Sequence, residues 1–148
     1  MSEIGRYAEI ATIVFAVASL TFLGLLSYHY YLNIYNGTYE HQDPIVIKVI
    51  AKQYVWLFQY PNGTVVPDKL VLKAGQPYEL LITSEDVIHA LYFVQLGYKL
   101  EAIPGYTYHM YIVVNQPGIY NIYCAEFCGP GHYTMKGILV VVPSNSTG

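Results

Sequence analysis

The sequence predicts a mainly β protein, a β-sandwich or Greek-key barrel preceded by one N-terminal transmembrane helix. Three observations predict it. The stretch from Ile10 to Leu32 contains no Asp, Glu, Lys or Arg. After residue 44, about seven short apolar segments follow one another at a spacing of roughly 8–12 residues, separated by Gly- and Pro-containing turns. No apolar repeat of helical period and useful length occurs in that region.

The first 35 residues are expected to form a membrane anchor. As a helix, the run IATIVFAVASLTFLGLL with the following SYHYYL is long enough to cross a hydrocarbon core of about 30 Å. A cleaved signal peptide is the competing interpretation, because Ala16-Val17-Ala18 resembles a cleavage site. The apolar run continues well beyond that site, and Glu3 and Glu9 precede it, whereas a signal peptide begins with positive charge. We therefore expect a retained anchor.

The charges around the anchor predict its orientation. Arg6 precedes the span, and no Lys or Arg follows until Lys48. Because positive residues stay on the inner side of a membrane, the N-terminus is placed inside and the remainder outside. Residues 36–44 are polar and turn-rich and are expected to be a linker, so residues 45–148 form the outer domain.

The outer domain is predicted from its apolar, β-branched segments. Turn signals separate them at PNG (61–63), AGQP (74–77) and NQPG (115–118). The predicted strands cover residues 45–51, 69–74, 78–84, 87–94, 106–114, 118–123 and 137–142. About 100 residues can bury a sandwich core without disulfide staples.

The composition excludes one class of partner. Only 11% of the residues are charged, the net charge is −3, and the 7 Lys and Arg residues are scattered singly. Because no basic stripe is present, nucleic-acid binding is not expected.

Both cysteines of the chain lie in one segment, CAEFCGPGHYTM at residues 124–135, between two predicted strands. Cys124, Cys128, His132 and Met135 place four metal-capable side chains in this loop. Two thiolates, an imidazole and a thioether form a soft ligand set, and a thioether favours copper over zinc.

A two-copper site needs a second histidine from elsewhere, because each copper bridged by two thiolates requires one imidazole and one weak ligand. His89 lies among apolar residues in VIHALYFV, where its burial costs desolvation unless something binds it. His109 in YTYHMYIVV is the rival, and its neighbours at alternate positions, Thr107 and Tyr111, favour a more polar face. Considered alone, either histidine is more typical of a structural residue than of a ligand.

The residues of the loop leave other interpretations open. A disulfide between Cys124 and Cys128 suits an outside compartment, but it leaves His132 and Met135 unexplained. A zinc site would use cysteine and histidine but would gain little from Met135. A mononuclear blue-copper site would need only one cysteine.

With these residues assembled, the chain resembles subunit II of the cytochrome c oxidase (haem-copper oxidase) family, which carries the dinuclear CuA centre. The family pattern Cys-x-Glu/Gln-x-Cys-Gly-x-x-His-x-x-Met and its upstream Asp-Val-Ile/Leu-His element are both matched. The matching residues are Cys124, Glu126, Cys128, Gly129, His132 and Met135, with Asp86, Val87, Ile88 and His89 upstream. The segment Lys99-Leu-Glu-Ala-Ile-Pro104-Gly105 also resembles a family segment.

The resemblance implies a ligand set and a fold. Cys124 and Cys128 would bridge two copper ions, with one imidazole each from His89 and His132. Met135 and the backbone carbonyl of Glu126 would be the weak axial ligands. The Glu126 side chain would face the catalytic subunit, where relatives place a magnesium-linked carboxylate. The implied fold is a cupredoxin-like β-sandwich.

The chain departs from the family pattern at three points. Many relatives have two transmembrane helices. This chain has room for one, and in this it is similar to the compact B-type (ba-like) oxidases. In the segment KQYVWLFQY, Tyr54 stands where relatives carry the tryptophan assigned to electron uptake, whereas Trp56 is retained. These two residues are the candidates for the point at which electrons enter. Tyr106 replaces the usual arginine after Pro104-Gly105.

The resemblance implies a function in a respiratory chain. The subunit would accept single electrons from an external donor, a cytochrome c or a small copper protein. It would pass them to haem in catalytic subunit I, where O2 is reduced to water with proton translocation. The expected location is the plasma membrane of a prokaryote, single-pass, with the copper domain on the outer (periplasmic or extracellular) face. The alternative is the CuA-bearing subunit of a nitric oxide reductase, whose loop can carry the same pattern.

Overall fold

A computed structural model of the chain describes residues 3–35 and 43–145. The chain divides into a helical unit up to residue 42 and a β unit from residue 43 onward. Most of the predicted linker, residues 36–42, lies outside the described residues.

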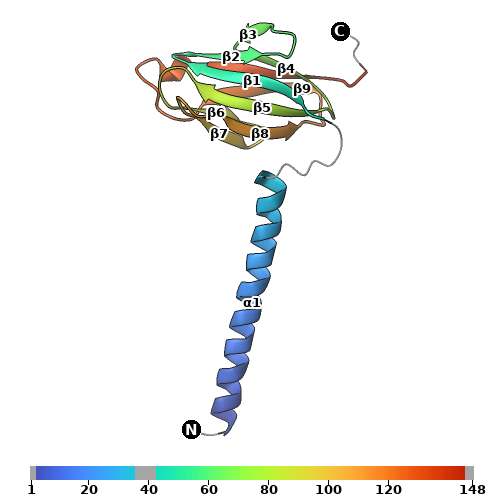
Figure 1. The fold of residues 1–148 in the computed structure, drawn as a ribbon, viewed down its shortest axis with the longest axis vertical. Coiled ribbons are helices and arrows are strands. Elements are labelled where there is room, and N and C mark those ends of the chain that lie inside the picture. Colours follow the sequence, from blue (N-terminus) through green and yellow to red (C-terminus); the bar gives the residue numbers. More distant parts are fainter. Residues whose placement is uncertain (1–2, 36–42, 146–148) are drawn as a thin grey trace. The chain divides into compact units, whose positions relative to one another are not determined.

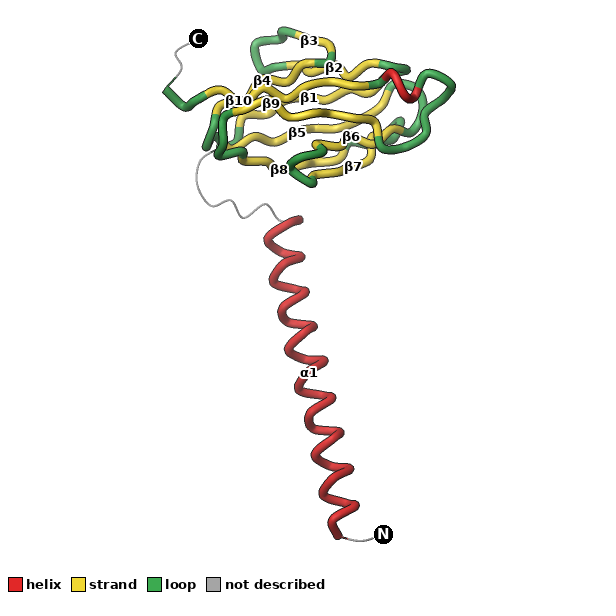
Figure 2. Tube along the Cα trace, turned by 180° about the vertical axis from the view of Figure 1, so that it is seen from behind, coloured by secondary structure: helices red, strands yellow, loops and turns green. Residues whose placement is uncertain are grey.

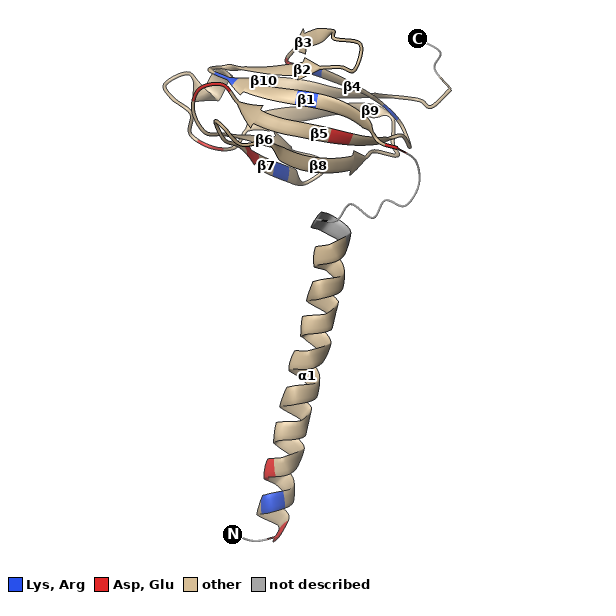
Figure 3. Cartoon of the chain, in the orientation of Figure 1, with Lys and Arg blue, Asp and Glu red and all other residues tan. Residues whose placement is uncertain are grey.

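The helical unit is one long helix, α1 (Glu3–Tyr35), of 33 residues. At 1.5 Å per residue such a helix is about 50 Å long, which exceeds the thickness of a hydrocarbon core. Its charged residues, Glu3, Arg6 and Glu9, gather near the N-terminal end, and the rest of the helix carries none (Figure 3). Within the described part of the chain, α1 is the one helix long and apolar enough to cross a membrane.

The β unit consists of two five-stranded sheets that face each other (Figures 1 and 2). The first sheet has the order β3-β2-β1-β5-β8, and the second has the order β4-β10-β9-β6-β7. Each sheet contains one parallel pair, β1 with β5 and β4 with β10. The strands of the first sheet are β1 (Ile45–Lys52), β2 (Val55–Gln59), β3 (Val65–Pro67), β5 (Pro77–Ser84) and β8 (Tyr108–Val113). Those of the second are β4 (Lys69–Lys73), β6 (His89–Phe93), β7 (Tyr98–Ala102), β9 (Gly118–Cys124) and β10 (Lys136–Val142).

Alternation of side chains along the strands builds the core between the sheets. In β5, every second residue from Tyr78 to Ser84 is buried, and β1 buries Ile47, Val49 and Ala51. Because successive side chains of a strand point to opposite faces, this pattern gives each sheet one apolar inner face. The core residues all belong to the β unit.

The predicted fold class, a cupredoxin-like β-sandwich preceded in the chain by one N-terminal helix, is confirmed. The number of strands differs, because the structure has ten where the sequence predicted about seven. The three additional strands are β2, β3 and β7. β3 has only three residues, and β7 is an edge strand with one fully buried side chain, so neither carries a clear apolar alternation. β2 does alternate between buried and half-buried residues, but its five residues lie within the segment KQYVWLFQY, whose aromatic residues suggest a different role from the sequence.

The metal-capable loop connects β9 to β10 and includes a short 3-10 helix, η1 (His132–Thr134). Its two ends are paired strands, since Tyr123 of β9 lies opposite Lys136 of β10. The loop is therefore held at both ends by the same sheet, which limits how far its residues can move.

We expect core and surface isoleucines of this sandwich to differ sharply in their contribution to stability. Ile82 is fully buried, whereas Ile119 is 69% exposed on a strand of the other sheet. Ile82→Ala should lower the free energy of unfolding by about 2–5 kcal/mol through lost burial and cavity formation. Ile119→Ala should cost less than about 1 kcal/mol. Urea titration followed by the fluorescence of the single tryptophan, buried Trp56, measures both values.

Candidate metal centre

Strand pairing places His89 beside Cys124. In the antiparallel pair of β6 and β9, Leu91 lies opposite Cys124. His89 is two residues before Leu91, so its side chain points to the same inner face of the sheet. Both side chains are buried, His89 fully. The register thus brings together two residues that are 35 positions apart in the chain.

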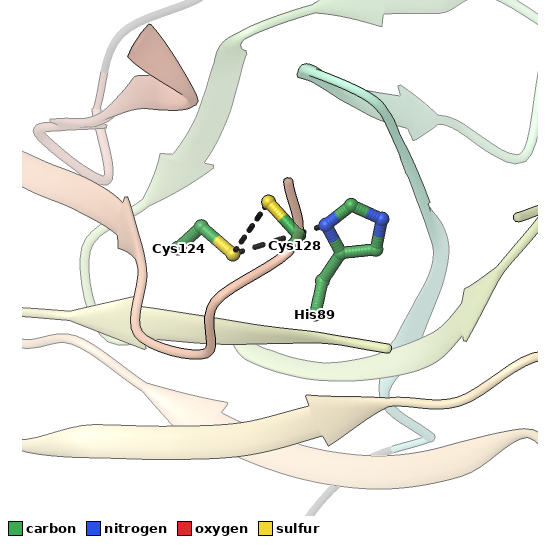
Figure 4. Close-up of side chains that lie close together, drawn as sticks. All are labelled: His89, Cys124 and Cys128. Carbon is green, nitrogen blue, oxygen red and sulfur yellow. Dashed lines mark hydrogen bonds between the residues drawn. The ribbon is translucent and has the colours of Figure 1, made fainter. Parts of the chain in front are cut away.

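The sulfur and nitrogen atoms of three residues form a tight group. His89 Nδ1 lies 3.8 Å from Cys124 Sγ, and Cys124 Sγ lies 3.7 Å from Cys128 Sγ. Figure 4 shows the imidazole directed toward the two sulfurs, with Cys128 reaching in from the loop. The donor atoms of the three residues lie within 4.8 Å of one another, so the group could hold a metal ion. Both cysteines are free thiols.

The loop adds three further donors around the same sulfurs. His132 Nδ1 lies 3.4 Å from Cys128 Sγ, and Met135 Sδ lies 3.8 Å from it. The carbonyl oxygen of Glu126 lies 3.2 Å from Cys124 Sγ. The structure therefore brings all six sequence-predicted ligand residues to one place.

The spacing and chemistry of these donors fit a metal. Two donors bound to one metal at about 2.0–2.3 Å lie about 3.5 Å apart at a tetrahedral angle. The neighbouring donors here are separated by 3.2–3.8 Å. The set contains two thiols and a buried thioether, Met135, which is 1% exposed. Soft sulfur donors of this kind favour copper over harder metals.

A carboxylate fixes the orientation of His89. His89 Nε2 lies 2.8 Å from Asp86 Oδ1, which leaves Nδ1 directed at Cys124. The backbone N–H groups of Gln53 and Val87 also donate to this carboxylate. Burial acts to raise the pKa of Asp86, but the hydrogen bonds from His89, Gln53 and Val87 outweigh it and lower the pKa to about 2. A carboxylate behind a metal-ligating histidine holds its tautomer and increases its basicity.

The thiol of Cys128 is protonated at neutral pH in the metal-free protein. Burial and the neighbouring Cys124 raise the pKa of Cys128 to about 12. A metal binds the thiolate, so metal uptake must displace this proton.

The other sequence-predicted residues lie in different surroundings. His109 is exposed, and its Nδ1 lies 2.6 Å from Glu79 Oε1 on the outer face of the first sheet. Trp56 is fully buried, and its ring meets that of His89 edge-on at 6.1 Å. Tyr54 is half-buried and packs against the core.

Two residues, Asp86 and Gln53, hold the site by hydrogen bonds that the sequence analysis does not predict. Asp86 was noted only as part of a matching pattern, although its position three residues before His89 could have indicated a partner for the imidazole. Gln53 donates from its side-chain Nε2 to the carbonyl oxygen of Cys128 at 2.6 Å. Gln53 lies in the segment KQYVWLFQY, which resembles the family's Gln-Trp-Tyr-Trp segment, but that likeness does not indicate a contact between its side chain and the metal loop.

Apolar side chains surround the donors at the surface. Ile88, Phe127 and Tyr133 are each the chain neighbour of a donor residue, and they are 47%, 73% and 74% exposed. The Phe127 ring also lies 5.9 Å from that of His132. We call these three residues the apolar rim.

Comparisons with known proteins give a consistent result. Residues 63–142 match the family model described as cytochrome C oxidase subunit II, periplasmic domain. The chain is 40% identical over 106 residues to the heme-copper oxidase subunit 2 of Aeropyrum pernix, covering 68% of this chain and 45% of the relative. It is 32% identical over 101 residues to the cytochrome c oxidase subunit 2 of Alkalihalophilus pseudofirmus, covering 68% and 30%. The chain thus spans less than half the length of these curated relatives.

Solved structures share the fold. The periplasmic domain of subunit II of the cytochrome oxidase of Bradyrhizobium japonicum superposes with a TM-score of 0.65 at 24% identity, covering 70% of this chain and 87% of that one. A chain of a heme-copper terminal oxidase dimer superposes with a TM-score of 0.61 at 24% identity, covering 91% and 99%. A third similar structure, with a TM-score of 0.61 and 25% identity, is a mixed disulfide between a thioredoxin-like protein and a cytochrome c oxidase subunit II; the match covers 70% of this chain and 85% of that one.

Removal of the carboxylate behind His89 should weaken metal binding. We expect Asp86→Asn to lower copper affinity about 10–100-fold, because the imidazole loses its charged partner while the side chain keeps its shape. Glu79→Gln is the matched control, since it removes the carboxylate beside exposed His109 and should leave the affinity unchanged. Competition with a chromophoric copper chelator, using the full chain in detergent, measures both. Equal affinities in the two variants would contradict a role for Asp86.

Proposed function

The chain belongs to the cytochrome c oxidase subunit II family, and we propose that it is the electron-accepting subunit of a terminal respiratory oxidase. In this proposal the subunit takes single electrons from an external donor, a cytochrome c or a small copper protein. The electrons then pass to haem in catalytic subunit I, where O2 is reduced to water and protons are translocated. Oxygen chemistry belongs to that partner.

The observation that carries the proposal is the donor set. Two thiols 3.7 Å apart are flanked by two imidazole nitrogens, a thioether and a backbone carbonyl. Cys124 and Cys128 would hold a pair of copper ions together with one imidazole from each of His89 and His132 and the weak donors of Met135 and Glu126. When bound, the copper pair supplies one-electron redox chemistry.

The chain's own contribution is to hold the donors still. Cys124 and His89 lie on paired strands of one sheet, and Met135 is buried directly before β10. Because packed strands resist displacement, the donors keep their positions when the charge at the site changes. A site that does not rearrange imposes a small barrier on electron transfer.

The apolar rim is the proposed docking surface for the electron donor. Ile88, Phe127 and Tyr133 expose apolar area immediately beside the donor residues. Residues 40–148 contain only 8 acidic and 6 basic side chains, so long-range charge steering is weak. The proposed contact is therefore mainly apolar, as in interfaces organised around aromatic anchors.

The membrane and subunit contacts follow the same proposal. In this proposal the chain crosses the membrane once, with α1, the described helix long and apolar enough to do so, as its span. We place it in the plasma membrane of a prokaryote, with the copper domain on the outer face. Glu126 has an exposed side chain, and we assign its carboxylate to a magnesium ion at the interface with subunit I.

A thioredoxin-like protein is a further proposed partner, for assembly. Such a protein forms a mixed disulfide with a subunit II in one similar structure. In this chain Cys124 and Cys128 are close enough to be oxidised together, and both must be thiols before copper can bind. A dithiol reductant would keep them available.

The copper assignment predicts a specific magnetic signature. Copper-loaded chain in detergent should contain two copper ions and show the EPR hyperfine pattern of one unpaired electron shared equally by two copper nuclei. His89→Ala should abolish this pattern, because one copper loses its imidazole. His109→Ala should leave it intact, since His109 is exposed and pairs with Glu79. A pattern from a single copper nucleus in the unmodified chain would contradict the proposal.

The docking proposal predicts which side chains the electron donor requires. Phe127→Ala and Tyr133→Ala should each slow second-order reduction of the copper-loaded chain by its donor about tenfold, because exposed aromatic anchors contribute most to such contacts. Ile119→Ala, on an exposed residue at the other end of β9, should have no effect. Stopped-flow reduction at several salt concentrations measures the rates. A steep fall with rising salt would contradict an apolar contact.

A further inference from the structure

We propose that Gln53 and Tyr54, at the tip of the hairpin between β1 and β2, form a clamp that positions the metal loop against His89. The inference rests on the proposed copper function, and it adds two positioning residues that contribute no donor atom to the site. The metal centre has a strand half, Asp86 and His89, and a loop half, Cys128 to His132. The clamp contacts both.

Gln53 connects the two halves by hydrogen bonds. Its backbone N–H donates to Asp86 Oδ2 at 2.7 Å, and the other oxygen of Asp86 holds His89. Its side-chain Nε2 donates to the carbonyl oxygen of Cys128 at 2.6 Å. Gln53 therefore binds both Asp86, the partner of the buried His89 imidazole, and the backbone of Cys128, whose thiol is buried. These partners are 33 and 75 positions away along the chain.

Tyr54 sets the path of the loop by filling the space above its glycines. A Cβ at Gly131 would lie 2.4 Å from Tyr54 Cε2, and a Cβ at Gly129 would lie 2.6 Å from the Tyr54 hydroxyl oxygen. Both distances are shorter than real Cβ contacts. The loop backbone thus lies directly on the tyrosine ring, and a Cβ at either position would force the ring or the loop to shift.

The two glycines differ in what they require. Gly129 has a φ of +134°, so any side chain there is strained by the backbone alone. Gly131 has a φ of −89° and a ψ of 7°, in the bridge region that residues with a side chain occupy in turns. An alanine at residue 131 is therefore a steric probe of Tyr54 that does not require a positive φ.

The position of these residues is unusual for a hairpin tip. Tips are normally exposed and tolerant of change, because their groups face water. Gln53 is exposed as a residue, yet both its backbone and side-chain N–H groups donate to the metal centre. One backbone bond, from Ala125 N to Ala90 O, ties the start of the loop to β6, whereas His132 N to Gly129 O and Thr134 N to Gly131 O join residues within the loop. The two internal bonds shape the loop, and Gln53 adds an attachment at Cys128, three residues beyond Ala125.

A double-mutant cycle tests the Tyr54 contact in the full chain in detergent. Gly131→Ala should weaken copper binding about tenfold, because the new methyl group displaces the loop from the ring. Tyr54→Ala with Gly131→Ala should recover most of that loss, since the obstruction is gone. The pair should also recover the shared-electron EPR pattern. Equal effects of Gly131→Ala in the presence and absence of the Tyr54 ring would overturn the contact.

A second set of variants tests Gln53. Gln53→Glu keeps the length of the side chain but replaces the donor with a carboxylate facing the carbonyl of Cys128. Gln53→Glu and Gln53→Ala should both alter the EPR hyperfine pattern and weaken copper binding, whereas Gln116→Ala, at an exposed turn, should do neither. If Gln53→Glu behaves as the unmodified chain, the hydrogen bond has no positioning role and the proposal is wrong.

A copper-free measurement separates the clamp from the copper assignment. Amide hydrogen exchange in the metal-free chain should become faster at His132 and Thr134 in both Gln53 variants, while exchange in β5 stays unchanged. Faster loop exchange supports the clamp even if the unmodified chain fails to bind a copper pair, in which case only the proposed function is wrong. Unchanged loop exchange overturns the clamp.

Discussion

The metal centre depends on one register, the antiparallel pairing of β6 with β9 that puts Leu91 opposite Cys124. A shift by one residue would turn His89 to the outer face of the sheet, because side chains alternate along a strand. The centre would then lose its one donor from outside the loop. The apolar inner faces enforce the register, since the same shift would expose Leu91 and Phe93, both fully buried. The hydrophobic core therefore specifies the site as well as the fold.

The metal-donor residues are easier to predict from the sequence than the residues that position them. The soft ligand residues from Cys124 to Met135 are close together because they lie in one short loop. His89 is recognisable because it is a polar residue in an apolar strand. The two-sheet fold followed from strand alternation, but β7, with its exposed residues, carried no such signal. The contact from Gln53 to Cys128 joins a side-chain amide to a backbone carbonyl across 75 positions. A backbone acceptor has the same chemistry at every residue, so no pattern of residue types reveals it.

The two histidine–carboxylate pairs of the domain show how surroundings decide the role of similar chemistry. His89 with Asp86 is buried beside two thiols, whereas His109 with Glu79 lies on the outer face of the first sheet. A buried imidazole must be satisfied on both nitrogens, and the carboxylate serves only one of them. The remaining nitrogen of His89 faces sulfur, which makes it available to a metal. In the exposed pair of His109 and Glu79, water can satisfy the second imidazole nitrogen, so no further protein partner is needed.

The division of donors between one loop and one strand makes the site a test of folding. Five of the six donor residues belong to the loop from Cys124 to Met135, so even an unfolded chain keeps them near one another along the sequence. His89 joins them only when β6 and β9 have paired correctly. A metal held by the complete set therefore binds the native chain more tightly than any misfolded one, and by mass action it stabilises that state. Tight retention of the metal therefore indicates that β6 and β9 have paired in the native register.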